Sequence, residues 1–199
     1  WASKFIKITK KTHSKIIKFF KWLLSLILVL LFPPYIRTEF KERVTGADLM
    51  QSICKNCGNL KVFLLGADEG VAEKPKKILQ QRYNRLAIVG TYAGSPKKQE
   101  EKKIIEMIDR SGAQILFVAY GAPAQEIWIY RNLKKLKTVK LAAGVGGSFD
   151  FIAGVRRRAP NWMQKIGLEW FYRLLQEPKR IARIYRATVK FPVRILKSR

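Results

Sequence analysis

The sequence predicts an α/β fold in which helices cover both faces of a parallel sheet. Two observations carry this prediction: short apolar runs end at glycine, and amphipathic segments of helical period separate these runs. A third is that strand and helix alternate along the middle of the chain, as is typical of parallel sheets. The chain is expected to comprise an atypical basic and apolar segment (1–40), an α/β core (41–155) and a basic helical appendage (156–199).

The first segment contains an uninterrupted apolar run, "WLLSLILVLLF", from Trp22 to Phe32. The run is shorter than the roughly 20 residues of a typical membrane-spanning helix. Three interpretations stay open: a signal-peptide core, although no small-residue cleavage site follows, an interfacial basic helix, or a buried core helix.

The core begins with a helix over "VTGADLMQSICKNCG", for which Gly58 is the stop signal. Pro75 belongs in the first turn of the next helix. In the helix after that, Ser95 is the expected cap, Pro96 fits the first turn and Gly112 ends it. A further helix lies within Gly121–Leu136. The predicted strands lie in the segments "KVFLLGA", "RLAIVGTYAG", "QILFVAYGAP" and "VKLAAGVGGSFD".

Glycines cluster where these strands end, and in parallel sheets ligands bind outside the carboxyl ends of the strands. Glycine allows a ligand to approach the backbone closely. Gln125 lies just past the third strand, at the start of a helix whose dipole favours anions. We therefore expect Gln125 to face a ligand.

The appendage reads as two helices separated by Pro178, with Trp162 and Trp170 on one face of the first. Arginines alternate with aromatic and aliphatic residues in both. This pattern fits a helix on an anionic membrane surface, and equally a core-packed helix with a solvated basic face.

Charge and motifs exclude several functions. The net charge of +26 suggests an anionic partner, but no helix-turn-helix or aromatic RNA-binding platform is recognisable. The sequence has no P-loop, one histidine and no Asp-x-Asp motif, which argues against P-loop hydrolysis, a catalytic triad and a carboxylate-held metal. Cys54 and Cys57 are interpreted as ordinary cysteines of a reducing compartment.

Six segments together resemble the WecG/TagA/CpsF glycosyltransferase family, from about Lys41 to the end of the chain. The resemblance implies a Rossmann-like sheet and a C-terminal helical appendage that binds the membrane. The segments are "RVTGADLM", "FLLGA", "IVGTYAG", "ILFVAYGAPAQEIWI", "GVGGSFDFIAG" and "RRAPNWMQKIGLEWFYRLLQEPKRIARI".

The resemblance also implies a reaction. Members transfer a sugar from a UDP-sugar to a polyprenyl-diphosphate-linked sugar. The enzymes are peripherally attached to the cytoplasmic face of the plasma membrane. Among the donor sugars that members use, N-acetylmannosamine is our expectation, moved from UDP-N-acetylmannosamine to undecaprenyl-diphosphate-linked N-acetylglucosamine, with inversion, in teichoic acid synthesis. The enzyme would be an N-acetylglucosaminyldiphosphoundecaprenol N-acetyl-beta-D-mannosaminyltransferase. No cofactor or metal and no nucleic acid partner is expected; a homo-oligomer is possible.

Site residues follow from the resemblance position by position. Gln125 matches the family's pocket glutamine and Arg43 an arginine of the pocket, and both are assigned to catalysis. Asp150 matches a carboxylate near the nucleoside, with a helix cap as the alternative. Three appendage arginines are expected to reach the diphosphate, with a solvated edge as the alternative: Arg173, Arg180 and Arg183.

One part of the family pattern is missing. Residues 1–40 contain neither the Thr-x-Asn segment nor the Asp-Gly motif that carries the expected general base. The segment is therefore interpreted as non-native or truncated. Two alternatives to an active enzyme follow: an impaired remnant that retains UDP-sugar binding, and a basic nucleic-acid-binding protein.

Overall fold

The structure is a computed structural model that comprises two compact units. One unit contains Val44–Arg157, and the other contains Trp1–Arg43 together with Arg158–Arg199. The residues that the structure describes are 14–31, 44–56, 58–165, 168–178, 181–191 and 193–194.

The first of these units is built on a four-stranded parallel sheet. The strands are β1 (Lys61–Gly66), β2 (Ala87–Tyr92), β3 (Ile115–Ala119) and β4 (Leu141–Gly144). All four predicted strands are thereby confirmed. The order across the sheet is β2-β1-β3-β4. The chain runs outward from β1 to β2 and then returns past β1 to β3, so the connections reverse direction between β1 and β3. Ligands of open α/β sheets bind at such a reversal.

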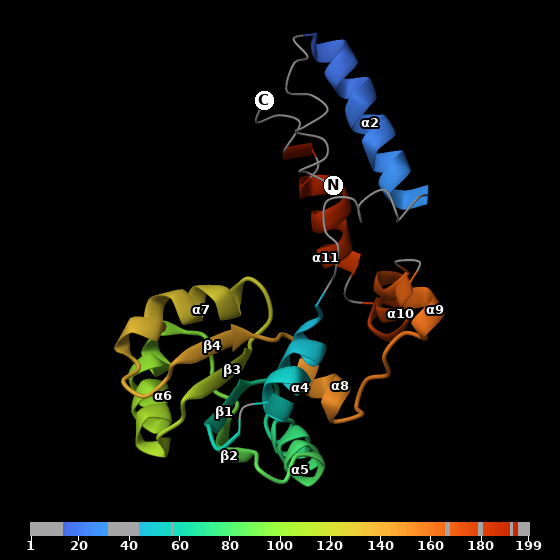
Figure 1. Cartoon of the computed structure of the whole chain (residues 1–199). Helices are drawn as coiled ribbons and strands as arrows, with labels where there is room; N and C mark the ends of the chain where they lie inside the picture. Colours follow the sequence, from blue (N-terminus) through green and yellow to red (C-terminus); the bar gives the residue numbers. More distant parts are fainter. Residues whose placement is uncertain are drawn as a thin grey trace. The chain divides into compact units, whose positions relative to one another are not determined.

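Helices cover both faces of the sheet, as predicted (Figure 1). Val62 and Leu64 point to one face, and Phe63 and Leu65 to the other, because side chains alternate along a strand. The first face packs against α4 (Gly46–Asn56), α5 (Glu73–Arg82) and α8 (Ser148–Ile152), and the second against α6 (Lys98–Ser111) and α7 (Ala124–Asn132).

Local contacts define the first turns of two helices. Thr45 Oγ1 accepts from the backbone N–H of Asp48 at 3.3 Å and donates to the Asp48 carboxylate at 2.7 Å. This pair closes the first turn of α4 and makes Asp48 part of a helix cap. Pro75 lies in the first turn of α5, as predicted, where the missing N–H has no helical acceptor to lose.

The start of α6 differs from the prediction, whereas α7 lies within the predicted range. Helix α6 begins at Lys98, not at Ser95, because Lys97 is extended and Ser95 uses its hydroxyl to accept from the Lys97 N–H at 3.3 Å. Its predicted stop is confirmed, since Gly112 is left-handed with φ 66°. Helix α7 ends at Asn132 and continues only as a 3₁₀ turn.

The second unit contains α2 (Lys15–Leu31), α9 (Asn161–Lys165), α10 (Glu169–Gln176) and α11 (Ile181–Tyr185), followed by a π-helical turn. Pro178 separates α10 from α11, as predicted. The helix expected to present both Trp162 and Trp170 is divided, because these residues lie in α9 and α10. Within the described part of the chain, no helix combines the length and apolar content needed to cross a membrane.

Candidate functional site

The carboxyl end of β1 is conformationally unusual. Gly66 and Ala67 both adopt positive φ, 99° and 66°, and exposed Asp68 follows them. A non-glycine residue at positive φ is strained, and such strain concentrates at functional sites. A Cβ on Gly66 would lie 2.9 Å from the carbonyl carbon of Ala119. Glycine therefore lets β1 and β3 approach closely at the reversal point of the sheet.

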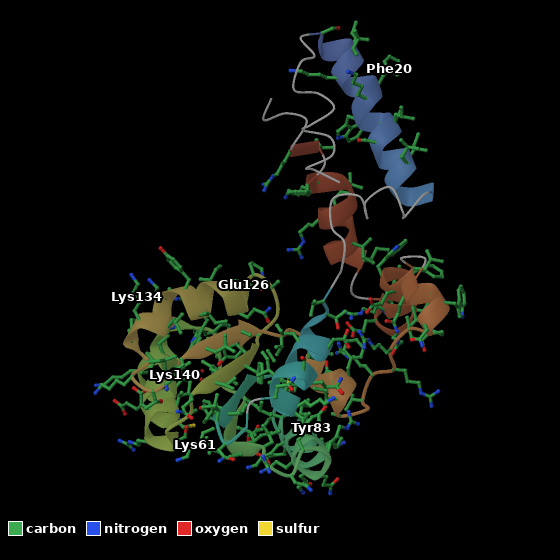
Figure 2. The ribbon with its side chains drawn as sticks, viewed as in Figure 1. Phe20, Lys61, Tyr83, Glu126, Lys134 and Lys140 are labelled. Carbon is green, nitrogen blue, oxygen red and sulfur yellow. The ribbon has the colours of Figure 1, made fainter. Side chains whose placement is uncertain are left out.

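Gln125 joins the ends of two strands. Its side-chain oxygen accepts from the backbone N–H of Gly121, just after β3, at 3.2 Å, and from that of Gly146, just after β4, at 2.9 Å. Its side-chain nitrogen donates to the Glu126 carboxylate at 2.8 Å. Glu126 itself lies exposed on α7 (Figure 2). The polar pair at the start of α7 thus organises the backbone of the strand ends.

This geometry assigns Gln125 a supporting position. The residue is 5% exposed, and its oxygen is occupied by two backbone donors. A Cβ on Gly144 would lie 2.6 Å from the Gln125 nitrogen, so glycine is required for Gln125 to occupy this place. The side chain thus shapes a surface on which a ligand would rest. Direct contact between Gln125 and a sugar stays a prediction.

The turn after β4 carries the second predicted residue of the core. Asp150 lies in the first turn of α8, and its carboxylate is 3.2 Å from the Arg156 guanidinium. The Asp150 side chain is 18% exposed and that of Arg156 38%, so the pair is partly exposed. Gly147, the cap residue of α8, has no side chain with which to cap the helix. The pair sits beside Gly147, since a Cβ there would lie 3.7 Å from Asp150 and 3.9 Å from Arg156.

The start of α4 packs directly against the same turn. A Cβ on Gly46 would lie 2.8 Å from both the Ser148 hydroxyl and the Val145 carbonyl oxygen. Ser148 is buried and donates to that carbonyl at 2.5 Å. The glycine of "TGADL" therefore serves close packing, and the start of α4 lies beside the turn that carries Asp150.

Tyr120 and Arg156 are site residues that the sequence analysis missed. Tyr120 follows β3, its ring packs edge-on to Trp128, and its buried hydroxyl has no hydrogen-bond partner among the described residues. Burial, reinforced by the negative charge of Glu100, raises the pKa of Tyr120 well above its usual range. The hydroxyl is therefore a neutral hydrogen-bond donor just past the carboxyl end of β3. The signal for Tyr120 was its place between an apolar run and glycine; for Arg156 it was hidden in a run of three arginines.

The predicted appendage arginines are described only in part. Arg173 lies in α10, where its guanidinium is 2.7 Å from the carboxylate of Glu169, a residue 4% exposed. Arg183 belongs to α11, but its side chain lies outside the described residues. Arg43 and Arg180 also lie outside them. Roles for these four arginines in binding or catalysis stay predictions.

A buried ionic network locks α6 to α7. Glu101 is 8% exposed, and its carboxylate is 2.6 Å from Arg131 and 3.6 Å from Lys135. Burial alone would raise the pKa of Glu101, but the Asn132 hydrogen bond and the two positive charges outweigh it and lower the pKa. An open hollow of about 600 Å³ lies along α6 beside this network. It is lined by charged side chains of α6 and the 3₁₀ turn, so it is separate from the strand ends described above.

The cysteines and carboxylates give no metal-binding geometry in the described part of the chain. Cys54 is buried in the core face of α4, and Cys57 lies outside the described residues. No group of three or more His, Cys, Asp or Glu side chains gathers among the described residues. Whether the reaction requires a metal stays a prediction.

One comparison with known proteins bears on this site. The model of the glycosyl transferase WecG/TagA/CpsF family matches residues 25–199. The match includes the whole sheet, the Gln125 and Asp150 turns and the appendage. It also begins within α2, some way before the point at which the sequence resemblance starts.

Proposed function

The chain belongs to the glycosyl transferase WecG/TagA/CpsF family, and from this membership we propose a specific reaction. The protein transfers N-acetylmannosamine from UDP-N-acetylmannosamine to undecaprenyl-diphosphate-linked N-acetylglucosamine. The anomeric configuration inverts, and the product feeds teichoic acid synthesis. The family itself implies only a nucleotide-sugar donor and a lipid-linked acceptor.

The bond joining the carboxyl ends of β3 and β4 is the observation that supports this proposal. Gln125 holds Gly121 and Gly146 on one oxygen and so fixes two glycine turns beside the reversal point of the sheet. Fixed backbone amides lower the cost of organising a site around a bound nucleotide. We assign Asp150, which is partly exposed on the second turn, to accept hydrogen bonds from the ribose hydroxyls of UDP.

The chemistry asks for two further contributions. The acceptor hydroxyl must lose a proton as it attacks the anomeric carbon from the face opposite the UDP leaving group. The diphosphate must be stabilised as it gains charge, which arginine does through forked hydrogen bonds. We assign the diphosphate to Arg173, Arg180 and Arg183 and place Arg43 in the pocket. No metal enters this scheme, and the protein works at the cytoplasmic face of the membrane as a peripheral protein.

The test is release of UDP in the presence of a short-chain, water-soluble analogue of the lipid-diphosphate acceptor. UDP-N-acetylmannosamine should support acceptor-dependent release, and UDP-glucose and UDP-N-acetylglucosamine should not. Release with another sugar alone would correct the donor while leaving the glycosyltransferase intact. No release with any UDP-sugar or acceptor would contradict the proposed activity.

One observation favours a second candidate. Because residues 1–40 contain no Asp-Gly motif, the chain lacks the family's expected base in that segment. An impaired protein would bind UDP-sugar and release no UDP. Calorimetric titration with UDP, performed beside the release assay, separates this remnant from an active enzyme.

A further inference from the structure

Helix α2 exposes apolar side chains and buries polar ones, which is the reverse of a typical surface helix of a globular protein. Among the α2 side chains that the structure describes, every exposed one is apolar, and Phe20 is labelled in Figure 2. Lys18 and Lys21 are half-buried, and Ser25 is 1% exposed. The exposed side chains are Ile16, Ile17, Phe19, Phe20, Leu23, Leu24 and Ile27.

These side chains form one continuous surface. Successive residues of a helix are separated by about 100°, so positions 16, 20, 23, 24 and 27 fall on one side. Phe20 is 62% exposed and Leu24 56%. Phe19 stacks on Trp22 with ring centroids 5.8 Å apart and packs edge-on to Phe20 at 5.9 Å. The stripe is aliphatic apart from Phe20, and a contiguous exposed apolar surface of this kind marks an interaction site.

The polar residues of α2 lie on its opposite side. Ser25 is there, and its hydroxyl donates to the Trp22 carbonyl oxygen at 2.8 Å. Lys18 and Lys21 lie on this side as well. A helix with one apolar face and lysines on its polar face is the pattern of helices that lie in a membrane interface. This arrangement argues against one interpretation of the apolar run, because the described face is not buried as in a core helix.

Charge indicates which partner covers the stripe. The unit that contains α2, residues 1–43 and 158–199, carries 21 Lys and Arg against 4 Asp and Glu, a net charge of +17. A second copy of this unit would meet it with like charge, whereas anionic lipid attracts such a basic surface. We propose that α2 lays this apolar stripe into an anionic lipid surface and so forms an attachment point additional to the appendage. This inference goes beyond the proposed function, because attachment of α2 to lipid does not depend on sugar transfer and is measured separately from it.

Co-sedimentation of the full chain with vesicles tests the proposal. The vesicles are phosphatidylcholine with or without phosphatidylglycerol. The variant Phe20→Glu/Leu24→Glu should bind the phosphatidylglycerol vesicles at least about tenfold more weakly than the parent, since two large apolar side chains no longer enter the lipid. Tyr130→Glu is the matched control, because Tyr130 is 88% exposed on α7 of the other unit. It should bind like the parent.

A second double variant separates the contribution of α2 to lipid binding from that of the appendage. Leu175→Glu/Ile181→Glu changes exposed apolar residues of α10 and α11. Lipid binding that is lost in this variant but unchanged in Phe20→Glu/Leu24→Glu would overturn the proposal. So would a parent that is dimeric without vesicles and becomes monomeric in the α2 variant, because the stripe would then cover a second copy.

Two measurements keep these results interpretable. Circular dichroism verifies folding, and Phe20→Ser/Leu24→Ser replaces the glutamate variant if that variant unfolds. Transfer to the short-chain soluble acceptor is measured in parallel and should be the same in the α2 variant and the parent. If no protein transfers sugar, the proposed function fails while the vesicle result still judges α2.

Discussion

The side-chain oxygen of Gln125 accepts a hydrogen bond at 2.9 Å from the backbone N–H of Gly146, which is 21 residues further along the chain. The same oxygen accepts from Gly121. One buried amide thereby determines the relative position of the turns that end β3 and β4. The candidate site depends on this bridge, and the first two predictions test it.

Gln125→Leu should destabilise the protein and weaken UDP binding. The substitution keeps the approximate volume but leaves two backbone N–H groups without their acceptor, at about 1–3 kcal/mol for each buried group. Urea unfolding measures the stability, and calorimetric titration with UDP measures the binding. Gln81→Leu on exposed α5 is the control and should change neither. An unchanged free energy of unfolding in Gln125→Leu would show that the bridge is unimportant.

Gly144→Ala should displace Gln125 although alanine is a small residue. The new methyl group would lie 2.6 Å from the Gln125 nitrogen, and such overpacking costs about 1–3 kcal/mol. Gly147→Ala is a sharp control: its φ is −74° and its nearest described neighbours would be 3.7 and 3.9 Å away. Urea unfolding should therefore separate the two alanine variants. Equal stability would contradict the close contact.

Asp150→Asn should raise the KM for the UDP-sugar, roughly tenfold for one charge-assisted hydrogen bond, with little effect on stability. The Asp150–Arg156 pair is partly exposed and therefore partly screened, so its loss should cost on the order of 1 kcal/mol. Arg156→Gln removes the same ion pair but keeps the carboxylate, so its KM should change less. If both variants lose equal stability and neither changes KM, the pair serves the fold alone.

Arg173→Gln should lower kcat/KM for the lipid-diphosphate acceptor by roughly tenfold or more, because an ionic hydrogen bond to phosphate is worth about 1.5–3 kcal/mol. Arg186→Gln, at an exposed position after α11, is the comparison and should have a smaller effect. Since Arg173 pairs with Glu169, thermal unfolding of both variants must be measured as well. A loss of stability without a selective loss of kcat/KM would indicate that Arg173 serves only α10.

Glu101→Gln should destabilise the protein at neutral pH by about 1–3 kcal/mol, through loss of the ion pairs with Arg131 and Lys135. Because the folded-state pKa of Glu101 is lowered from 4.5, the carboxylate stabilises the parent fully above that pH. The stabilisation is lost as the pH falls through the folded-state pKa. Urea unfolding at pH 7 and at successively lower pH should therefore show the two proteins converging. Glu106→Gln, whose pair with Arg110 is exposed, should show little difference at pH 7.

Much of the fold was predictable because the relevant signals are local. Each strand is an apolar run with a glycine at or near its end, and the hydrogen bonds between Thr45 and Asp48 span three residues. The start of α6 was predicted wrongly because Ser95 makes two hydrogen bonds that hold a turn before the helix instead of capping it. Its hydroxyl turns to Lys97 while its N–H donates to Glu100 at 3.0 Å, and periodicity does not distinguish this turn from a cap.

The candidate site was less predictable than the fold. Gln125 was singled out correctly as a residue at the strand ends, but its acceptors lie in two separate turns. Asp150 gave no sign that Arg156 would pair with it. Helical or strand periodicity predicts neither the Gln125–Gly146 hydrogen bond nor the Asp150–Arg156 ion pair. Both depend on the conformation of the segment that follows β4.

Local pattern was sufficient to establish that this chain is an α/β protein with parallel strands, since apolar period and glycine stops act over a few residues. Long-range packing settled the strand order, the burial of Gln125 and the outward-facing apolar stripe of α2. These features depend on which surfaces pack against each other in the folded chain. The sequence pattern predicts that a helix or strand has an apolar face, but it does not predict what that face packs against.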